Sequence, residues 1–321
     1  MPLEFRKAQR KAAPMLMAIS SVSGGGKTFS SLLVAAGIAG HNGRVGMIDT
    51  ENGRGEMYAD SPGIRAALPN GYDYLRFDPP FGPDRYIEHI RAAEDAGITV
   101  CVVDSGTHEW EGTGGCAEIA EKNKLGGMPN WAKAKMSHKR FVNHLLSSPM
   151  HIIFCLRARD KVKIFKKGDL LVTSAGSVVE DGQVAEKDMI VPLGLQPICE
   201  KNFVFEMLVS LQLDEHTHHA VPLKVPEPLA RLFPGRKLLT KADGEAIQRW
   251  NCDAPALDIS ERLRQRARSA AEDGVAAYQE FWASISKDDR KAIAADHEGN
   301  KITAQRADAS MPVAEPVEGI Q

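Results

Sequence analysis

The sequence lacks any apolar run long enough to cross a membrane. Its first apolar run, Met15–Ile19, is also too short for the hydrophobic region of a signal sequence. Its five cysteines are odd in number, widely spaced and without a C-x-x-C pair. A formal net charge of −2 gives no overall positive field, so any contact with nucleic acid has to come from a local patch. We therefore expect a cytoplasmic protein with reduced thiols and no membrane partner.

Short apolar runs bounded by turn residues alternate with helical patterns, which is typical of buried parallel strands joined by crossover helices. Between the first two runs, apolar residues from Phe29 to Ala36 recur with helical spacing before Gly40. The other expected helices are Pro83–Ala96 and Asn130–Ser147. The pattern predicts an α/β fold with a mostly parallel central sheet. Its expected strands are Met15–Ile19, Val45–Asp49, Ile98–Asp104 and His151–Leu156.

The pattern changes after Leu156. Two strand-like pieces, Lys161–Phe165 and Leu170–Ser174, flank a KKGD turn and predict a β-hairpin. Phe203–Leu213 and Ala220–Val225 are expected to be further strands. We expect residues 1–255 to form the core, 256–296 a small helical region, and 297–321 a disordered tail poor in apolar groups.

The segment SVSGGGKT, residues 21–28, follows an apolar strand and precedes an amphipathic helix, which is the context that a phosphate-binding loop requires. Backbone N–H groups at the start of the helix would hold phosphates, Lys27 would reach the β- and γ-oxygens, and Thr28 would ligate Mg²⁺. Ser21 replaces the first glycine of the usual pattern, at a steric cost if its φ is positive. The alternative is a glycine-rich turn with a chance GKT. The residues expected to bind the nucleotide are Ser23, Gly24, Gly25, Gly26, Lys27, Thr28 and Phe29.

Hydrolysis also requires a carboxylate beside the metal and a group that orients water. Asp104 ends an apolar strand, where ligands bind in open α/β sheets; the less favoured alternative is that it only caps the next helix. The second strand ends in IDTE, which places Asp49 and Glu51 two residues apart on one side of an extended chain, and Glu51 there suits the general base. Glu109 and Glu111 are rival bases by position.

Read together, SGGGKT, VGMIDTE, VCVVDSGTHEW and HIIFCLR resemble the RecA-like core of P-loop ATPases. The resemblance implies Lys27 and Glu51 as catalytic residues, and Thr28 and Asp104 as metal ligands. The motifs IDTENGRGEMYAD, DSGTHEWEGTGG and HIIFCLRARDK further resemble the AAA-type ATP-binding proteins of tailed bacteriophages, whose relatives act in single-strand annealing and recombination. The two resemblances together imply a RecA-like fold, ATP and Mg²⁺ as cofactors, and a homo-oligomer. They also imply that Arg157 occupies the position that senses the γ-phosphate.

A row of cations follows the fourth strand. In an extended chain Arg157, Arg159, Lys161 and Lys163 share one face, and such a stripe can follow a single-stranded DNA backbone. The alternative is a solvated edge strand whose lysines block aggregation. The residues expected to contact nucleic acid are Arg159, Lys161, Lys163, Lys166 and Lys167.

For three other sets of residues the sequence favours a structural role over a functional one. His216, His218 and His219 lack the partners of a metal site and fit a polar turn. Trp110 and Trp131 fit helix packing better than contact with a base. The alternating arginines from 262 to 268 scatter around a helix, as on a solvated face.

Together with the resemblance, these patterns predict a Mg²⁺-dependent ATPase of phage type that acts in DNA recombination, single-strand annealing or replication, with slow or DNA-stimulated turnover. A second hypothesis is a nucleotide-gated interaction module, such as a helicase loader or regulator, with little turnover and no direct DNA contact. A small-molecule kinase fits less well, because no arginine-rich lid is evident.

Overall fold

The computed structural model describes residues 10–171, 183, 184, 186–252, 259–285 and 287–310. The chain forms two compact units. The larger comprises Pro14–Val142 and Met150–Asn251, and the smaller contains Cys252 and the helices that follow it. Among the residues just listed, no helix is both long and apolar enough to cross a membrane. All five cysteines are free.

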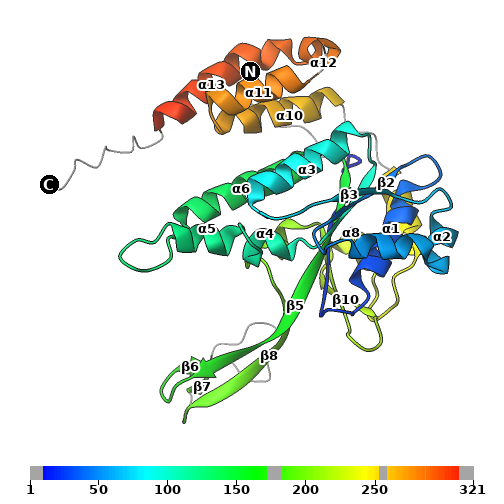
Figure 1. The fold of residues 1–321 in the computed structure, drawn as a ribbon, viewed down its shortest axis with the longest axis vertical. Coiled ribbons are helices and arrows are strands. Elements are labelled where there is room, and N and C mark those ends of the chain that lie inside the picture. The colour runs from blue at the N-terminus through cyan, green and yellow to red at the C-terminus, as the bar shows by residue number, and fades with distance from the viewer. Residues whose placement is uncertain (1–9, 172–182, 185, 253–258, 286, 311–321) are drawn as a thin grey trace. The chain divides into compact units, whose positions relative to one another are not determined.

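A mostly parallel sheet forms the centre of the larger unit (Figure 1). Its strand order is β10-β9-β1-β5-β4-β2-β3, and along this path only the β9–β10 pair is antiparallel. The predicted α/β fold with a mostly parallel sheet is confirmed. The strands are β1 Leu16–Ser21, β2 Val45–Asp49, β3 Asp73–Arg76, β4 Val100–Asp104, β5 His151–Phe165, β9 Val209–Leu213 and β10 Ala220–Lys224.

Helices cover both faces of the sheet because the central strands bury alternate residues on opposite sides. One face packs against α1 (Lys27–Ala39), α2 (Pro62–Ala67) and α9 (Lys241–Cys252), with Ile153 of β5 in the shared core. The next residue, Phe154, points to the other face, where it meets Phe141 of α6. Further rings on that face include Tyr86 and Phe203. The helices there are α3 (Pro83–Asp95) and α6 (Trp131–Ser147). Shorter helical elements of the larger unit include η1 Arg54–Asp60, α4 Thr107–Glu111, α5 Cys116–Lys122 and α8 Glu227–Ala230.

Two glycines let α1 and α9 approach closely. A Cβ on Gly244 would lie 2.1 Å from the carbonyl oxygen of Val34, and one on Gly37 would lie 2.1 Å from that of Lys241. We expect Gly244→Ala to lower the free energy of unfolding by about 2 kcal/mol, although alanine favours helices, because backbone atoms have to separate. Chemical denaturation followed by circular dichroism measures the change. Gly299→Ala, whose Cβ meets nothing within 4 Å, is the control and should not destabilise; equal stability of both variants contradicts the prediction.

The end of β5 corrects the predicted hairpin. β5 continues past Leu156 to Phe165, and its antiparallel partner is β8 (Met189–Pro197), whereas the expected partner begins as β6 (Leu170–Leu171) and pairs with β7 (Gln183–Val184). The KKGD turn does form, since the Asp169 N–H donates to the Lys166 carbonyl, but Phe165 is buried against Val191 and Met189 of β8. Apolar burial thus selects the distant strand. Residues 172–174 of the expected strand lie outside the described chain.

Two other expectations are wrong in part. Phe203–Glu206 is a helical turn, α7, because Phe203 packs into the aromatic cluster, and the strand starts at Val209. Residues His297–Ser310 form helix α13 rather than a disordered segment, because Ala304 is buried in the core of the helical bundle. The remaining residues, 311–321, lie outside the described chain.

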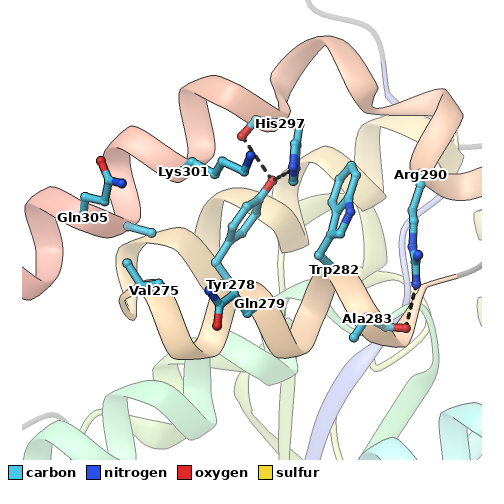
Figure 2. Close-up of a pocket in the computed structure, with 10 residues that line it drawn as sticks. Val275, Tyr278, Gln279, Trp282, Ala283, Arg290, His297, Lys301 and Gln305 are labelled. Carbon is cyan, nitrogen blue, oxygen red and sulfur yellow. Dashed lines mark hydrogen bonds between the residues drawn. The ribbon is translucent and has the colours of Figure 1, made fainter.

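The smaller unit is a bundle of α10 (Ile259–Glu272), α11 (Val275–Ser284), α12 (Lys287–Ala292), η2 (Ala294–Asp296) and α13. This bundle contains a cavity of about 560 Å³. Figure 2 shows that Tyr278 and Trp282 of α11 face His297 there. The Tyr278 hydroxyl lies 2.9 Å from His297 Nδ1, and the Trp282 and His297 rings stack with centroids 3.8 Å apart. Phosphate-loop residues do not line this cavity.

Candidate nucleotide-binding site

The phosphate loop connects β1 to α1, with left-handed backbone at Gly24 (φ 82°) and Gly26 (φ 81°). Glycine is needed at Gly25 for another reason, since a Cβ there would lie 2.0 Å from Ser21 Oγ. The loop therefore leads into the N-terminus of α1, the positive end of the helix, which favours an anion.

Ser21 does not bear the steric cost expected of it. It is the last residue of β1, and the non-glycine residues with positive φ in the described chain are Asn52 and His218. Its buried hydroxyl donates to the Leu213 carbonyl at 2.9 Å and so joins β1 to β9. The serine is compatible with the loop.

Lys27, Thr28 and Asp104 meet at the carboxyl edge of the sheet. The ammonium of Lys27 donates to the carbonyl oxygens of Val22 (2.7 Å) and Ser21 (3.3 Å). Thr28 Oγ1 donates to Asp104 Oδ2 at 2.5 Å. Burial raises the pKa of Asp104 to about 6, with nearby Glu51 adding to the rise and the Thr28 hydrogen bond opposing it. A hydroxyl beside a carboxylate is an oxygen donor set that fits Mg²⁺.

Glu51 and Arg157 form an ion pair across this edge. The Arg157 guanidinium donates to both carboxylate oxygens of Glu51, with contacts of 3.0 and 2.7 Å to Oε1 and 2.5 Å to Oε2. The Glu51 side chain is 13% exposed, and the Arg157 N–H is fixed by Thr107 Oγ1 at 2.8 Å. The charge of Glu51 also raises the pKa of Asp104, so the two carboxylates belong to one site.

Asp49, the other carboxylate of the IDTE motif, serves the local structure. It is fully buried and accepts the N–H groups of Glu51 (2.5 Å) and Gly55 (3.0 Å) and the Tyr74 hydroxyl (2.8 Å). These bonds hold the turn that presents Glu51.

Thr50 and His108 also lie at this edge, and the sequence motifs alone did not identify them. Thr50 Oγ1 accepts the Ser105 N–H at 2.7 Å and lies 2.7 Å from His108 Nδ1. Burial lowers the pKa of His108, which stacks on Phe81. His108 belongs to the THEW segment that follows β4, so the residue was visible in the sequence. Its proximity to Thr50 was not, because it depends on the parallel pairing of β2 with β4.

The rival bases are placed differently. Glu109 is buried in the larger unit, where its Oε1 lies 3.0 Å from His138 Nδ1 and accepts the Cys116 thiol at 3.2 Å. Glu111 lies 3.8 Å from Arg159 at the surface. Of these three carboxylates, Glu51 is the one whose charge raises the pKa of Asp104, and this favours it as the base.

The buried Glu109–His138 pair predicts a pH-dependent stability. Burial opposes the imidazolium charge, but the hydrogen bond and charge of Glu109 outweigh it and raise the pKa of His138 above its usual value. The pair therefore stabilises the fold fully below about pH 6.5 and loses this contribution as the pH rises through the raised pKa.

We expect His138→Gln to lower the free energy of unfolding by about 3 kcal/mol at pH 6, because the Glu109 charge loses its partner. The difference from wild type should shrink toward pH 9. Denaturant titrations at several pH values test this, with exposed His41→Gln as the control. A difference that stays constant with pH contradicts the raised pKa.

The remaining predicted residues have clear positions. Phe29 packs near Tyr58, with ring centroids 6.5 Å apart. Trp110 and Trp131 stack on each other at 5.3 Å, as helix packing requires. Arg264 pairs with Asp296, and Arg266 lies over the Phe281 ring.

The cations of the β5–β8 ribbon lie beyond Arg157. Arg159, Lys161 and Lys163 are exposed alternate residues of β5, so they share one face of the ribbon, and Lys163 lies 4.5 Å from the Phe165 ring centroid. Lys166 and Lys167 are exposed in the following turn. Val162 and Ile164 occupy the opposite face and are also exposed.

Comparison with known proteins agrees with this core. The model of a family described as an AAA domain matches residues 13–191, more than half of the chain. The search of curated proteins found no match. One similar solved structure is described as a prototypical ATPase from the type III secretion system of pathogenic bacteria. It is 11% identical to this chain with a TM-score of 0.34, and the match covers 90% of this chain and 73% of that structure's chain, a likeness too distant to bear on function. The chain belongs to the AAA-domain family, and its phosphate loop stands in the α/β core of a P-loop ATPase.

Proposed function

We propose that the chain is a Mg²⁺-dependent ATPase of phage type that works on single-stranded DNA, in recombination, annealing or replication. The observation that carries the proposal is the continuity of β5. Arg157 contacts Glu51 at the nucleotide site, and the same strand continues directly into the cations of the ribbon. Occupation of the ribbon by DNA would thus act on the partner of the proposed base.

The residues at the site have complementary roles in this proposal. The phosphate-loop N–H groups and Lys27 would bind and orient the phosphates. Thr28 and Asp104 would hold Mg²⁺, which neutralises charge on phosphate oxygens when bound. Glu51 would orient a water molecule and accept its proton, and Arg157 would hold the Glu51 carboxylate until DNA binds the ribbon. The proposal includes a homo-oligomer, ring or filament, in which a neighbouring copy supplies a further cation.

The exposed cations of the ribbon fit binding of a polyanion better than protection of an edge strand alone. An edge strand can be protected by one or two lysines, whereas here three exposed cations repeat on one face and two more follow in the turn. Repeated cations contact successive phosphates of a flexible strand, and binding then depends on salt.

The test is ATP hydrolysis with and without single-stranded DNA, together with DNA affinity across a salt series. We expect DNA to stimulate hydrolysis, and Lys161→Ala/Lys163→Ala to reduce the slope of log affinity against log salt by about 1.4, since each phosphate contact contributes about 0.7.

The control is Lys133→Ala/Lys135→Ala, which removes two exposed lysines from α6 and should leave the slope unchanged. Hydrolysis that ignores DNA, with no salt-dependent DNA binding, would instead support the nucleotide-gated interaction module.

A further inference from the structure

The turn between β9 and β10 lies beside the phosphate loop. β9 pairs in parallel with β1, with Gln212 opposite Ser20, so both strands release their chains at the same edge of the sheet. The Ser21 hydroxyl, bonded to the Leu213 carbonyl, joins the two strands at that edge. The turn of residues 214–219 therefore starts next to the loop of residues 22–26.

Asp214 holds this turn in one conformation. Its Oδ1 accepts the N–H of His216 (3.1 Å), the N–H of Thr217 (2.9 Å) and the Thr217 hydroxyl (2.9 Å). These hydrogen bonds lower the pKa of Asp214 to about 2. Two backbone bonds close the turn, from His218 N–H to the Asp214 carbonyl and from Asp214 N–H to the His219 carbonyl.

This conformation puts His218 against the phosphate loop. Its φ is 57°, a left-handed backbone that few non-glycine residues adopt, and such residues concentrate at functional sites. A Cβ built on Gly26 would lie 3.3 Å from His218 Nδ1 and 3.4 Å from its Cγ. The imidazole thus lies beside the residue that precedes Lys27, at the N-terminus of α1, and it remains exposed.

We propose that His218 is a further ligand of the nucleotide, donating an imidazole N–H to its phosphates. The assignment rests on the proposed nucleotide binding and deepens it. Phosphates are the favoured target because the ring lies where the loop N–H groups and the helix terminus attract an anion. The neighbouring His216 differs, since its Nε2 lies 3.1 Å from Glu215 Oε1 in the same exposed turn.

Two substitutions separate the ring from the backbone. His218→Gly removes the imidazole and suits the positive φ, so it should not strain the turn. His218→Asn keeps an N–H donor and also tolerates left-handed backbone. His216→Ala is the matched control in the same turn.

The experiment is calorimetric titration of the full chain with ATP, ADP, inorganic tripolyphosphate and adenosine. We expect His218→Gly to weaken ATP, ADP and tripolyphosphate about tenfold, the loss of one charge-assisted hydrogen bond, His218→Asn to lose less, and His216→Ala to match wild type. Unchanged ATP affinity in His218→Gly overturns the assignment, as does a loss confined to adenosine and ATP that spares tripolyphosphate. Wild type that binds none of the four would overturn the proposed function itself, and the assignment with it.

Discussion

Lys27→Ala is expected to lower the affinity for ATP by about 100-fold. Lys27 is only 8% exposed, and its ammonium already lies at the phosphate loop, on the carbonyls of Val22 and Ser21. A positive charge held in a partly buried loop makes charged hydrogen bonds of about 1.5–3 kcal/mol to an anion, which corresponds to roughly 10- to 150-fold in affinity. The nearby Arg157 does not replace it in this role, because Glu51 engages its guanidinium.

Titration with a fluorescent ATP analogue measures this loss. Lys124→Ala is a suitable control, since that lysine pairs with Glu121 on the surface. The fold should survive the change, because in the described chain the Lys27 ammonium bonds only to loop carbonyls; circular dichroism checks this. Affinity within a few-fold of wild type would show that the loop does not bind nucleotide through Lys27.

Features encoded by neighbouring residues could be predicted from the sequence. The loop before α1 and the carboxylate of Asp104 each depend on an apolar run followed at once by polar or glycine residues, and both lie where expected. The parallel direction of the central strands follows from the same alternation of runs and helices.

Features that depend on distant pairing could not be predicted in this way. The partner of β5 is decided by Phe165, which is buried by Val191 about 25 residues later, and no local signal distinguishes that strand from the nearer one. His218 presents the same problem, because its turn is polar, as expected, yet reaches the phosphate loop only through the pairing of β9 with β1. Helix α13 was missed because a few small residues such as Ala304, rather than a broad apolar face, anchor it.

Glu51→Gln is expected to reduce the rate of ATP hydrolysis by about 100- to 10,000-fold while leaving ATP affinity nearly unchanged, as loss of a general base does. Glutamine keeps the size of the side chain and one oxygen that Arg157 can contact, but it cannot take a proton from water. Single-turnover hydrolysis and ATP titration separate the two effects. Glu111→Gln, at the surface near Arg159, is the control and should retain full turnover.

In the conformation described, Arg157 holds the Glu51 carboxylate, which is therefore not free to act on water. If Glu51 is the base, wild type should hydrolyse ATP slowly until DNA on the ribbon shifts Arg157, and Glu51→Gln should stay inactive with or without DNA. If the pair is only structural, Glu51→Gln should lower stability and leave DNA-stimulated turnover intact, which would transfer the role of base to Glu109 or Glu111. The DNA dependence of the variant therefore decides between a catalytic and a purely structural ion pair.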